Sequence, residues 1–341
     1  MYSLIGLLVI AVGSFGQSSS YVPIKRIRKW FWENFWLVQG VFSWLILPLI
    51  GACLVLPAGT GMGDVWRMDG AVEALVYGAL WGVGSLTFGL SMKYLGVALG
   101  QSLALGTCAA FGTLLPLLLR GEPLFSKEYA LLLTGVCISL VGIFIIGYAG
   151  HLRSKLLEEK RKMEEVQSFS LVKGVVIALI SGITGACFAL GLEAGGPIKE
   201  MMLANGCNGL FAGLPVVFLV TFGGLFTNML YCVVQNIRNH SAGEYLSVKK
   251  SDLLNNIMYC LLAGVLWYSQ FFGLEVGKDF LKESPVLLSF SWSILMSLNV
   301  IFSNLWGIIL SEWKGCDVRT IATLIIGLIV LIVSICLVAV T

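Results

Sequence analysis

The sequence predicts an all-α polytopic membrane protein whose ten transmembrane helices form a five-plus-five inverted repeat. Three observations lead to this prediction. Of 341 residues, 57% are hydrophobic and only 12% are charged, and the mean hydropathy of +0.90 is far outside the range of soluble proteins. The charges are gathered between ten apolar stretches of about 20 residues, the length that a helix needs to cross a bilayer. Weak similarities also relate the two halves of the chain.

This composition excludes several classes of protein. Little of the length remains for a soluble catalytic domain, and a net charge of +3 is too small for a basic nucleic-acid binder. The chain contains no GxSxG, HExxH or Walker A motif, and both histidines, His151 and His240, lie in predicted loops. The nine cysteines lack metal-ligand spacing. We therefore expect a protein that is not an enzyme and that binds neither a metal nor nucleic acid.

Window hydropathy places the ten spans along the chain. Each must be a helix, because lipid offers the backbone no hydrogen-bond partner and the alternating pattern of a barrel strand is absent. We expect the first span to be a membrane helix and not a signal peptide, since no Lys or Arg precedes its apolar run. The expected spans are residues 2–22, 36–56, 71–92, 96–119, 129–149, 171–193, 209–234, 254–275, 286–310 and 319–340.

The positive residues of the loops predict the orientation of the chain. Of the 22 Lys and Arg residues, 16 fall in one set of alternate loops and 6 in the other. Positive residues are retained in the cytoplasm, so the richer set is expected inside. Both termini are then expected on the outer side.

A charged connector at residues 151–170 predicts the domain organisation. It separates a first five-helix repeat, residues 1–150, from a second, residues 171–341. Gly6 to Val12 (GLLVIAV) resembles Gly174 to Ile180 (GVVIALI), as expected for two copies of one unit. With an odd number of spans in each copy, the second copy must be inserted upside down. Inverted repeats are typical of secondary transporters, whose substrate site lies near the midplane where the copies meet.

Aromatic and amide side chains within the spans form the candidate substrate site. Four of the ten tryptophans lie well inside the spans and not at the membrane interface. A neutral sugar lays its C–H face on an aromatic ring while its hydroxyls bind amides and similar groups. Close packing is the alternative explanation for each of these side chains. The candidates are Gln17, Trp44, Trp81, Ser85, Gln101, Trp267, Gln270, Trp292 and Asn299.

Two carboxylates are candidates for proton coupling. Glu193 closes the sixth span and Glu275 the eighth, each directly after a Gly-Leu pair. A carboxylate at a span end is much less costly than one at the centre, so both positions are also explained without a function. If one proton crosses with each sugar, a potential of about 100 mV supplies about 2.3 kcal/mol, or roughly a fiftyfold accumulation. The proton gradient is thus the expected energy source, and no cofactor is expected.

Several stretches combine charged, proline and tryptophan positions in a specific pattern. They are Tyr21 to Trp30 (YVPIKRIRKW), Trp32-Glu33, Ser43 to Pro48 (SWLILP), Tyr77 to Gly84 (YGALWGVG), Gly89 to Gly96 (GLSMKYLG), Leu266 to Phe272 (LWYSQFF) and Glu312-Trp313. Together they resemble the L-rhamnose/proton symporter family over nearly the whole chain. That family belongs to the drug/metabolite transporter superfamily, which implies the same inverted repeat. The resemblance also implies pocket roles for Trp44, Trp81, Tyr268, Gln270 and Trp292.

The resemblance implies a proton-coupled symporter that imports L-rhamnose or a related 6-deoxyhexose across the bacterial inner membrane by alternating access. The expected partners are a small neutral sugar, protons and the lipid bilayer, and we expect a monomer with periplasmic termini. Two alternatives stay open. One is a drug or metabolite exporter of the same superfamily, and the other is a membrane sugar sensor that does not transport.

Overall fold

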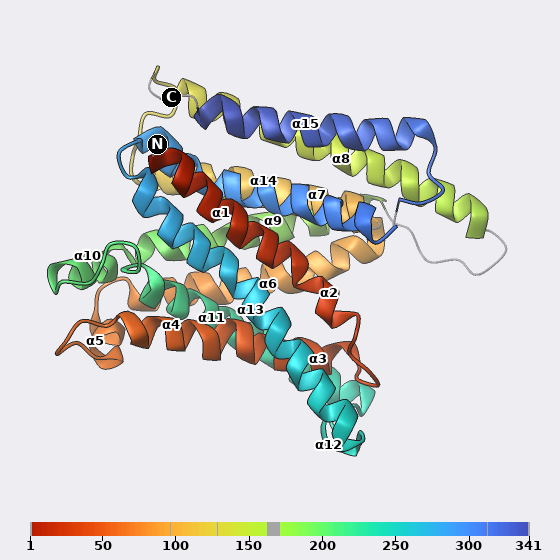
Figure 1. Ribbon diagram of the computed structural model, residues 1–341, viewed down its shortest axis with the longest axis horizontal. Coiled ribbons are helices and arrows are strands. Elements are labelled where there is room, and N and C mark those ends of the chain that lie inside the picture. Colours follow the sequence, from red (N-terminus) through yellow and green to blue (C-terminus); the bar gives the residue numbers. More distant parts are fainter. Residues whose placement is uncertain (1, 96, 128, 162–170, 312, 340–341) are drawn as a thin grey trace. The chain divides into compact units, whose positions relative to one another are not determined.

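The computed structural model describes residues 2–95, 97–127, 129–161, 171–311 and 313–339 (Figure 1). Within these ranges the regular elements are helices, and no strand occurs. In the described part of the chain, nine helical segments are long and apolar enough to cross a membrane, and the apolar part of α7, Leu103–Leu119, is a shorter tenth. The predicted all-α membrane class is therefore confirmed. The inverted relation of the two halves stays a prediction.

The helices follow the ten predicted spans in order. The first five correspond to α1 and α2 (Tyr2–Ser19, Tyr21–Ile24), to α3, η1 and α4 (Trp32–Gly40, Val41–Ile46, Leu47–Val55), to α6 (Ala71–Leu95), to α7 (Val97–Leu119) and to α8 (Ala130–Arg161). The last five are α9 (Leu171–Ala194), α11 (Leu214–Asn239), α13 (Lys250–Leu281), α14 (Pro285–Ile309) and α15 (Val318–Ala339). Between them lie the short helices α5 (Met62–Arg67), α10 (Gly196–Ala204) and α12 (Glu244–Ser247).

The predicted connector at residues 151–170 is helical where it is described. Residues 151–161 continue α8 beyond the predicted end of the fifth span, and residues 162–170 lie outside the described residues. The predicted repeats, 1–150 and 171–341, stay predictions.

The chain folds into two compact units, and each combines segments from both halves of the sequence. Unit 1 comprises Met1–Val83 and Leu190–Phe280, and unit 2 comprises Gly84–Ala189 and Leu281–Thr341. Two of the boundaries fall inside α6 and α9, so each of these helices contributes to both units, and the third separates Leu281 from the rest of α13.

In unit 1, α6 and α11 approach each other at glycines. A Cβ added at Gly78 would collide with the backbone of Val220, and one added at Gly223 would collide with the carbonyl of Leu75. Small residues permit this approach in a membrane, where close packing drives helix association. The same helix α11 packs against α3, η1 and α4 (Figure 1).

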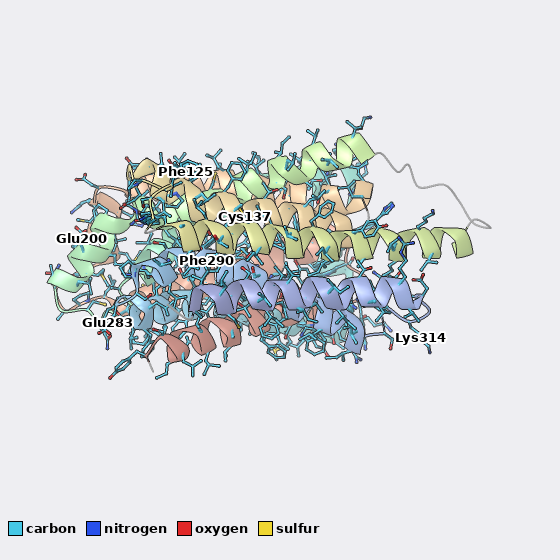
Figure 2. All side chains as sticks on the ribbon, turned by 90° about the horizontal axis from the view of Figure 1, so that it is seen from above. Phe125, Cys137, Glu200, Glu283, Phe290 and Lys314 are labelled. Atoms are coloured by element: carbon cyan, nitrogen blue, oxygen red, sulfur yellow. The ribbon has the colours of Figure 1, made fainter. Side chains whose placement is uncertain are left out.

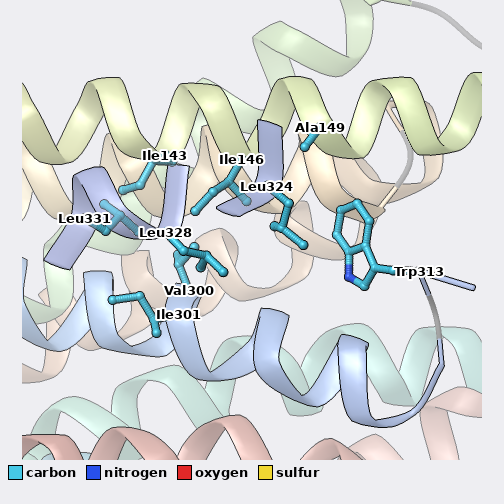
Figure 3. Close-up of a cluster of buried hydrophobic side chains, with 9 residues drawn as sticks. All are labelled: Ile143, Ile146, Ala149, Val300, Ile301, Trp313, Leu324, Leu328 and Leu331. Atoms are coloured by element: carbon cyan, nitrogen blue, oxygen red, sulfur yellow. The ribbon is translucent and has the colours of Figure 1, made fainter. Parts of the chain in front are cut away.

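In unit 2, α8 and α15 lie side by side, and α14 packs against both (Figure 1). Buried apolar side chains of these helices, together with Trp313 from the connection between α14 and α15, form the cluster shown in Figure 3, which consists of Ile143, Ile146, Ala149, Val300, Ile301, Trp313, Leu324, Leu328 and Leu331. A polar contact joins the same helices, because Ser334 Oγ donates to the Gly135 carbonyl at 2.8 Å and lies 2.6 Å from Ser139 Oγ. Ser334 donates its single hydroxyl proton to the Gly135 carbonyl, so the Ser139 hydroxyl is the donor in the contact between the two serines.

The connections of unit 2 lie at its two opposite ends. Phe125, between α7 and α8, and Glu283, before α14, are at one end, and Lys314, after α14, is at the other (Figure 2). Cys137 of α8 and Phe290 of α14 lie between these ends (Figure 2). This arrangement agrees with the predicted alternation of loops between the two sides of a membrane.

The packing of α8 on α15 predicts the effect of a larger residue at Gly327. A Cβ there would lie 2.6 Å from Ile146 Cγ1 and 3.0 Å from the Gly142 carbonyl oxygen. We expect Gly327→Leu to destabilise the protein by about 1–3 kcal/mol through overpacking. The readout is a lower melting temperature of the detergent-purified protein. Gly89→Leu is the control, since no described atom beyond its chain neighbours and the adjacent backbone of its own helix lies within 4 Å of a Cβ at that position. Equal melting of both variants would contradict the close contact.

Candidate substrate site

Three indole rings from three different spans meet in unit 1. Trp44 belongs to η1, Trp81 to α6 and Trp267 to α13, and we call these three residues the indole cluster. The ring centroids are 5.9 Å apart for Trp44–Trp81, 5.9 Å for Trp44–Trp267 and 5.8 Å for Trp81–Trp267. Trp44 meets its two neighbours at 90° and 78°, the edge-to-face geometry that the ring quadrupole favours. The structure thus brings together three of the four interior tryptophans identified in the sequence.

Glycines make room for these rings. A Cβ added at Gly40 would come 2.6 Å from the ring of Trp44, one turn later on the same span. A Cβ added at Gly224 on α11 would collide with the ring of Trp81. Either substitution would force an indole to move, so the two glycines help to fix the cluster.

A π-helical turn carries Trp44. Pro48 has no N–H, and its ring occupies the space beside the carbonyl of the residue four positions earlier, which is Trp44. The regular α-helical hydrogen bonding cannot continue through this point, and the π-helical segment η1 lies directly before α4, in which Pro48 occupies the first turn. Such turns are frequent at functional sites. The sequence analysis did not predict this distortion, although the presence of Pro48 was a signal for it.

Trp36 belongs to the same aromatic group. Its ring centroid lies 5.7 Å from that of Trp44, and its Nε1 donates to Asn228 Oδ1 at 3.0 Å. Asn228 in turn donates from Nδ2 to the Gly224 carbonyl at 2.9 Å, which fixes the orientation of the amide. The sequence analysis did not include Trp36, because a tryptophan near a span end also fits an interfacial anchor.

Two candidate residues of the site have a buried polar atom without a hydrogen-bond partner among the described residues, Trp44 Nε1 and Tyr268 Oη. Three further such atoms in unit 1 are Ser14 Oγ, Asn34 Oδ1 and Gln39 Oε1. The Tyr268 hydroxyl lies against Gly51 of α4, where an added Cβ would be 2.6 Å away. Leaving such a buried group unpaired costs about 1–3 kcal/mol. A ligand rich in hydroxyl groups has the donors and acceptors to satisfy both atoms.

The two amide candidates of unit 1 come from helices in direct contact. Gln270 is buried on α13, and Gln17 is half-buried on α1. The helices meet at Gly13, whose carbonyl accepts a hydrogen bond from Ser269 Oγ at 3.2 Å. Gln17 Oε1 lies 3.4 Å from the hydroxyl of Ser18, which is its neighbour in the chain.

The other four candidates belong to unit 2. Trp292 of α14 stacks on Phe188 with centroids 5.8 Å apart, and its Nε1 donates to the Cys108 carbonyl at 3.2 Å. These contacts fit a packing role, the alternative that the sequence left open. Asn299 is buried and Ser85 is half-buried, whereas the side chain of Gln101 lies outside the described residues.

The two candidate carboxylates have different surroundings. Glu275 is buried, with Oε1 at 3.0 Å from Lys278 Nζ and Oε2 at 3.5 Å from Lys199 Nζ. Two ammonium groups therefore balance its negative charge. Glu193 is exposed near the end of α9. The sequence analysis treated Lys199 only as one of the loop charges, because no residue near it in the sequence indicates the contact between α10 and α13.

Comparison with known proteins identifies the family. The family model for the L-rhamnose-proton symport protein (RhaT) matches residues 2–341. The chain is also similar to the L-rhamnose-proton symporters of Yersinia pestis (strain Pestoides F) and Yersinia pseudotuberculosis serotype O:1b (strain IP 31758). Each is 32% identical over 342 residues, which cover 97% of this chain and 96% of the relative. The chain therefore belongs to the L-rhamnose-proton symport protein family, a family of transporters and not of enzymes.

Proposed function

We propose that this protein imports L-rhamnose, or a closely related 6-deoxyhexose, together with protons across a bacterial inner membrane. The family match over residues 2–341 carries this proposal, and the names of the Yersinia relatives support it. The apolar helices among the described residues suit a multi-pass protein. The proton gradient supplies the energy, and the transport step needs no bound cofactor.

The indole cluster is the proposed platform for the sugar. A 6-deoxyhexose has a methyl group and ring C–H bonds that can lie on indole faces, while its hydroxyls form hydrogen bonds. Trp44 Nε1 and Tyr268 Oη are buried without partners among the described residues, which supports their assignment as sugar-binding groups. The amides of Gln17 and Gln270 are the proposed further hydrogen-bonding groups. Ser85, Gln101, Trp292 and Asn299 stay candidates in unit 2.

Transport by alternating access is the proposed mechanism. Sugar and proton bind together, and a conformational change then opens the site to the opposite side. An inverted repeat would provide two such conformations by exchanging the roles of its halves. The excess of positive residues in one set of loops supports cytoplasmic placement of that set and periplasmic termini. Glu193 and Glu275 are the proposed proton-coupling carboxylates at the outer ends of their spans, and the proposed state is a monomer.

Uptake into proteoliposomes tests the proposed function. With an imposed pH step, acid outside, we expect accumulation of labelled L-rhamnose and alkalinisation of the external medium. A potential of about 100 mV should support roughly fiftyfold accumulation for one proton per sugar. A panel of hexoses and deoxyhexoses measures specificity. Export of large apolar cations without sugar uptake would favour the exporter alternative, and sugar binding without flux would favour the sensor.

Trp267 and Gln270 provide the test of the site on α13. Trp267→Ala and Gln270→Ala should each reduce the initial rate of uptake at low sugar concentration at least about tenfold, equivalent to about 1.4 kcal/mol of lost binding. Trp66→Ala is the matched control, because Trp66 lies on α5 and packs on Phe218 and Phe222. Normal uptake by both α13 variants, at equal protein in the membrane, would remove this helix from the site.

A further inference from the structure

A buried carboxylate at the start of α3 has hydrogen-bond donors but no counter-ion. Glu33 is 4% exposed, and its Oε1 accepts hydrogen bonds from Asn239 Nδ2 at 2.9 Å and from Ser241 Oγ at 2.6 Å. Within the described part of the chain it forms no ion pair with Lys, Arg or His. The donors are the last residue of α11, Asn239, and Ser241 in the connection to α12, and this part of the chain lies beside α3 (Figure 1). Burial of an ionised carboxylate without a counter-ion is costly and is often connected with function.

The other two buried carboxylates of unit 1 are ion-paired. Asp252 Oδ2 lies 3.0 Å from Lys29 Nζ, and Glu275 Oε1 lies 3.0 Å from Lys278 Nζ. Adding a proton to either one would leave an ammonium group without its counter-ion. Adding a proton to Glu33 would break no ion pair, so this group can change its charge at lower cost.

When Glu33 is ionised, there is one proton too few for both oxygen contacts of Ser241 Oγ to be hydrogen bonds. Ser241 Oγ lies 2.6 Å from Glu33 Oε1 and 3.1 Å from Asn236 Oδ1, but a hydroxyl carries a single proton. Asn236 cannot supply the second proton, because its Nδ2 is directed at the Cys232 carbonyl at 2.9 Å and Oδ1 is an acceptor. One of the two oxygen–oxygen contacts is then without a hydrogen bond.

A proton on Glu33 completes this chain of hydrogen bonds. Oε1–H would donate to Ser241 Oγ, and the Ser241 hydroxyl would donate to Asn236 Oδ1, while Asn239 Nδ2 continues to donate to Oε1. We propose that Glu33 is a proton-binding site, at which a proton from water bonds to Oε1 and converts the carboxylate to a neutral acid. In the reverse step the proton is released to water, and the Ser241 hydroxyl again donates its hydrogen bond to Glu33 Oε1.

The other ionisable groups around Glu33 are anionic or neutral. Cys232 of α11 and Tyr245 of α12 lie close enough to interact with its charge, and Cys260 of α13 lies close to Tyr245. Glu244 of α12 accepts a hydrogen bond from Asn34 Nδ2 at 3.1 Å. The chain neighbours of Asn239, Arg238 and His240, are exposed.

Opposing influences therefore act on the charge of Glu33. The N-terminus of α3 and the two hydrogen-bond donors favour the anion, whereas burial favours the neutral acid. A lysine or arginine in contact with Glu33 would have favoured the anion alone.

The position of Glu33 suggests where it acts in the proton pathway, a role that rests on the proposed function. The loop before α3 is predicted to be cytoplasmic, whereas Glu193 and Glu275 close spans on the predicted outer side. The ring of Trp32 stacks on that of Trp36 at 5.0 Å, and Trp36 contacts Trp44 of the indole cluster. Glu33 thus lies at the predicted inner end of the span that carries Trp44, where a proton would be released to the cytoplasm.

Difference infrared spectroscopy of the full chain in lipid membranes tests proton binding directly. On acidification without sugar, we expect a C=O stretching band of a carboxylic acid that is lost in Glu33→Gln and retained in Glu244→Gln, the matched control. The absence of any such band in the wild type, or the same band in Glu33→Gln, would overturn the proposal. Because no sugar is present, failure of rhamnose uptake would not affect this result.

A second variant tests the hydrogen-bond chain without removing the carboxyl group. Asn236→Leu removes the acceptor needed by the protonated state and leaves both donors to the anion. The infrared titration of Glu33 should therefore move to lower pH by up to about one pH unit, the size of one hydrogen bond. An unchanged or higher midpoint in a variant that melts cooperatively would contradict the proposed chain.

Transport by Glu33→Gln tests the proposed role. The glutamine resembles the protonated carboxyl group, so exchange of labelled for unlabelled sugar should persist while accumulation driven by the pH step is lost. Accumulation equal to that of the wild type would show that protons cross without Glu33. Wild-type liposomes that accumulate sugar are the reference, and their failure would count against the proposed function and not against proton binding.

Discussion

Lipid offers no hydrogen-bond partner to a polar group, and this constraint explains both the fold and the site. It forces each span into a helix, because only then are the backbone groups paired within the segment. It also makes every buried polar side chain dependent on the protein or on a ligand. Most of those described here meet this need inside the chain, as Asn228 does with Trp36 and Gly224.

A few of the exceptions carry the functional interpretation. Trp44 Nε1, in a cluster of indole rings suited to the C–H face of a sugar, and Tyr268 Oη, against Gly51 of α4, are both buried without partners among the described residues. At Glu33 the oxygens are close together but one proton is missing. The same requirement thus indicates a hydroxyl-rich ligand in one place and a proton in the other, the two species named in the family's description.

The sequence predicted the helices and their order because long apolar stretches between charged loops can form little else in a bilayer. It also identified Trp44, Trp81 and Trp267 as candidates for the site, because a tryptophan inside a span is not explained by the membrane interface. It could not predict the contacts between distant segments. Nothing local to Lys199 indicates that it pairs with Glu275, and nothing near Ser241 indicates that it binds Glu33. The π-helical turn at Trp44 depends on how Pro48 is accommodated within the folded span.

The most direct test of the account is a structure of the protein in a lipid environment with L-rhamnose bound. The account predicts the sugar against the rings of Trp44, Trp81 and Trp267, with its hydroxyls within hydrogen-bond distance of Trp44 Nε1 or Tyr268 Oη. A sugar bound away from these rings, with the indole cluster packed as it is here, would contradict it.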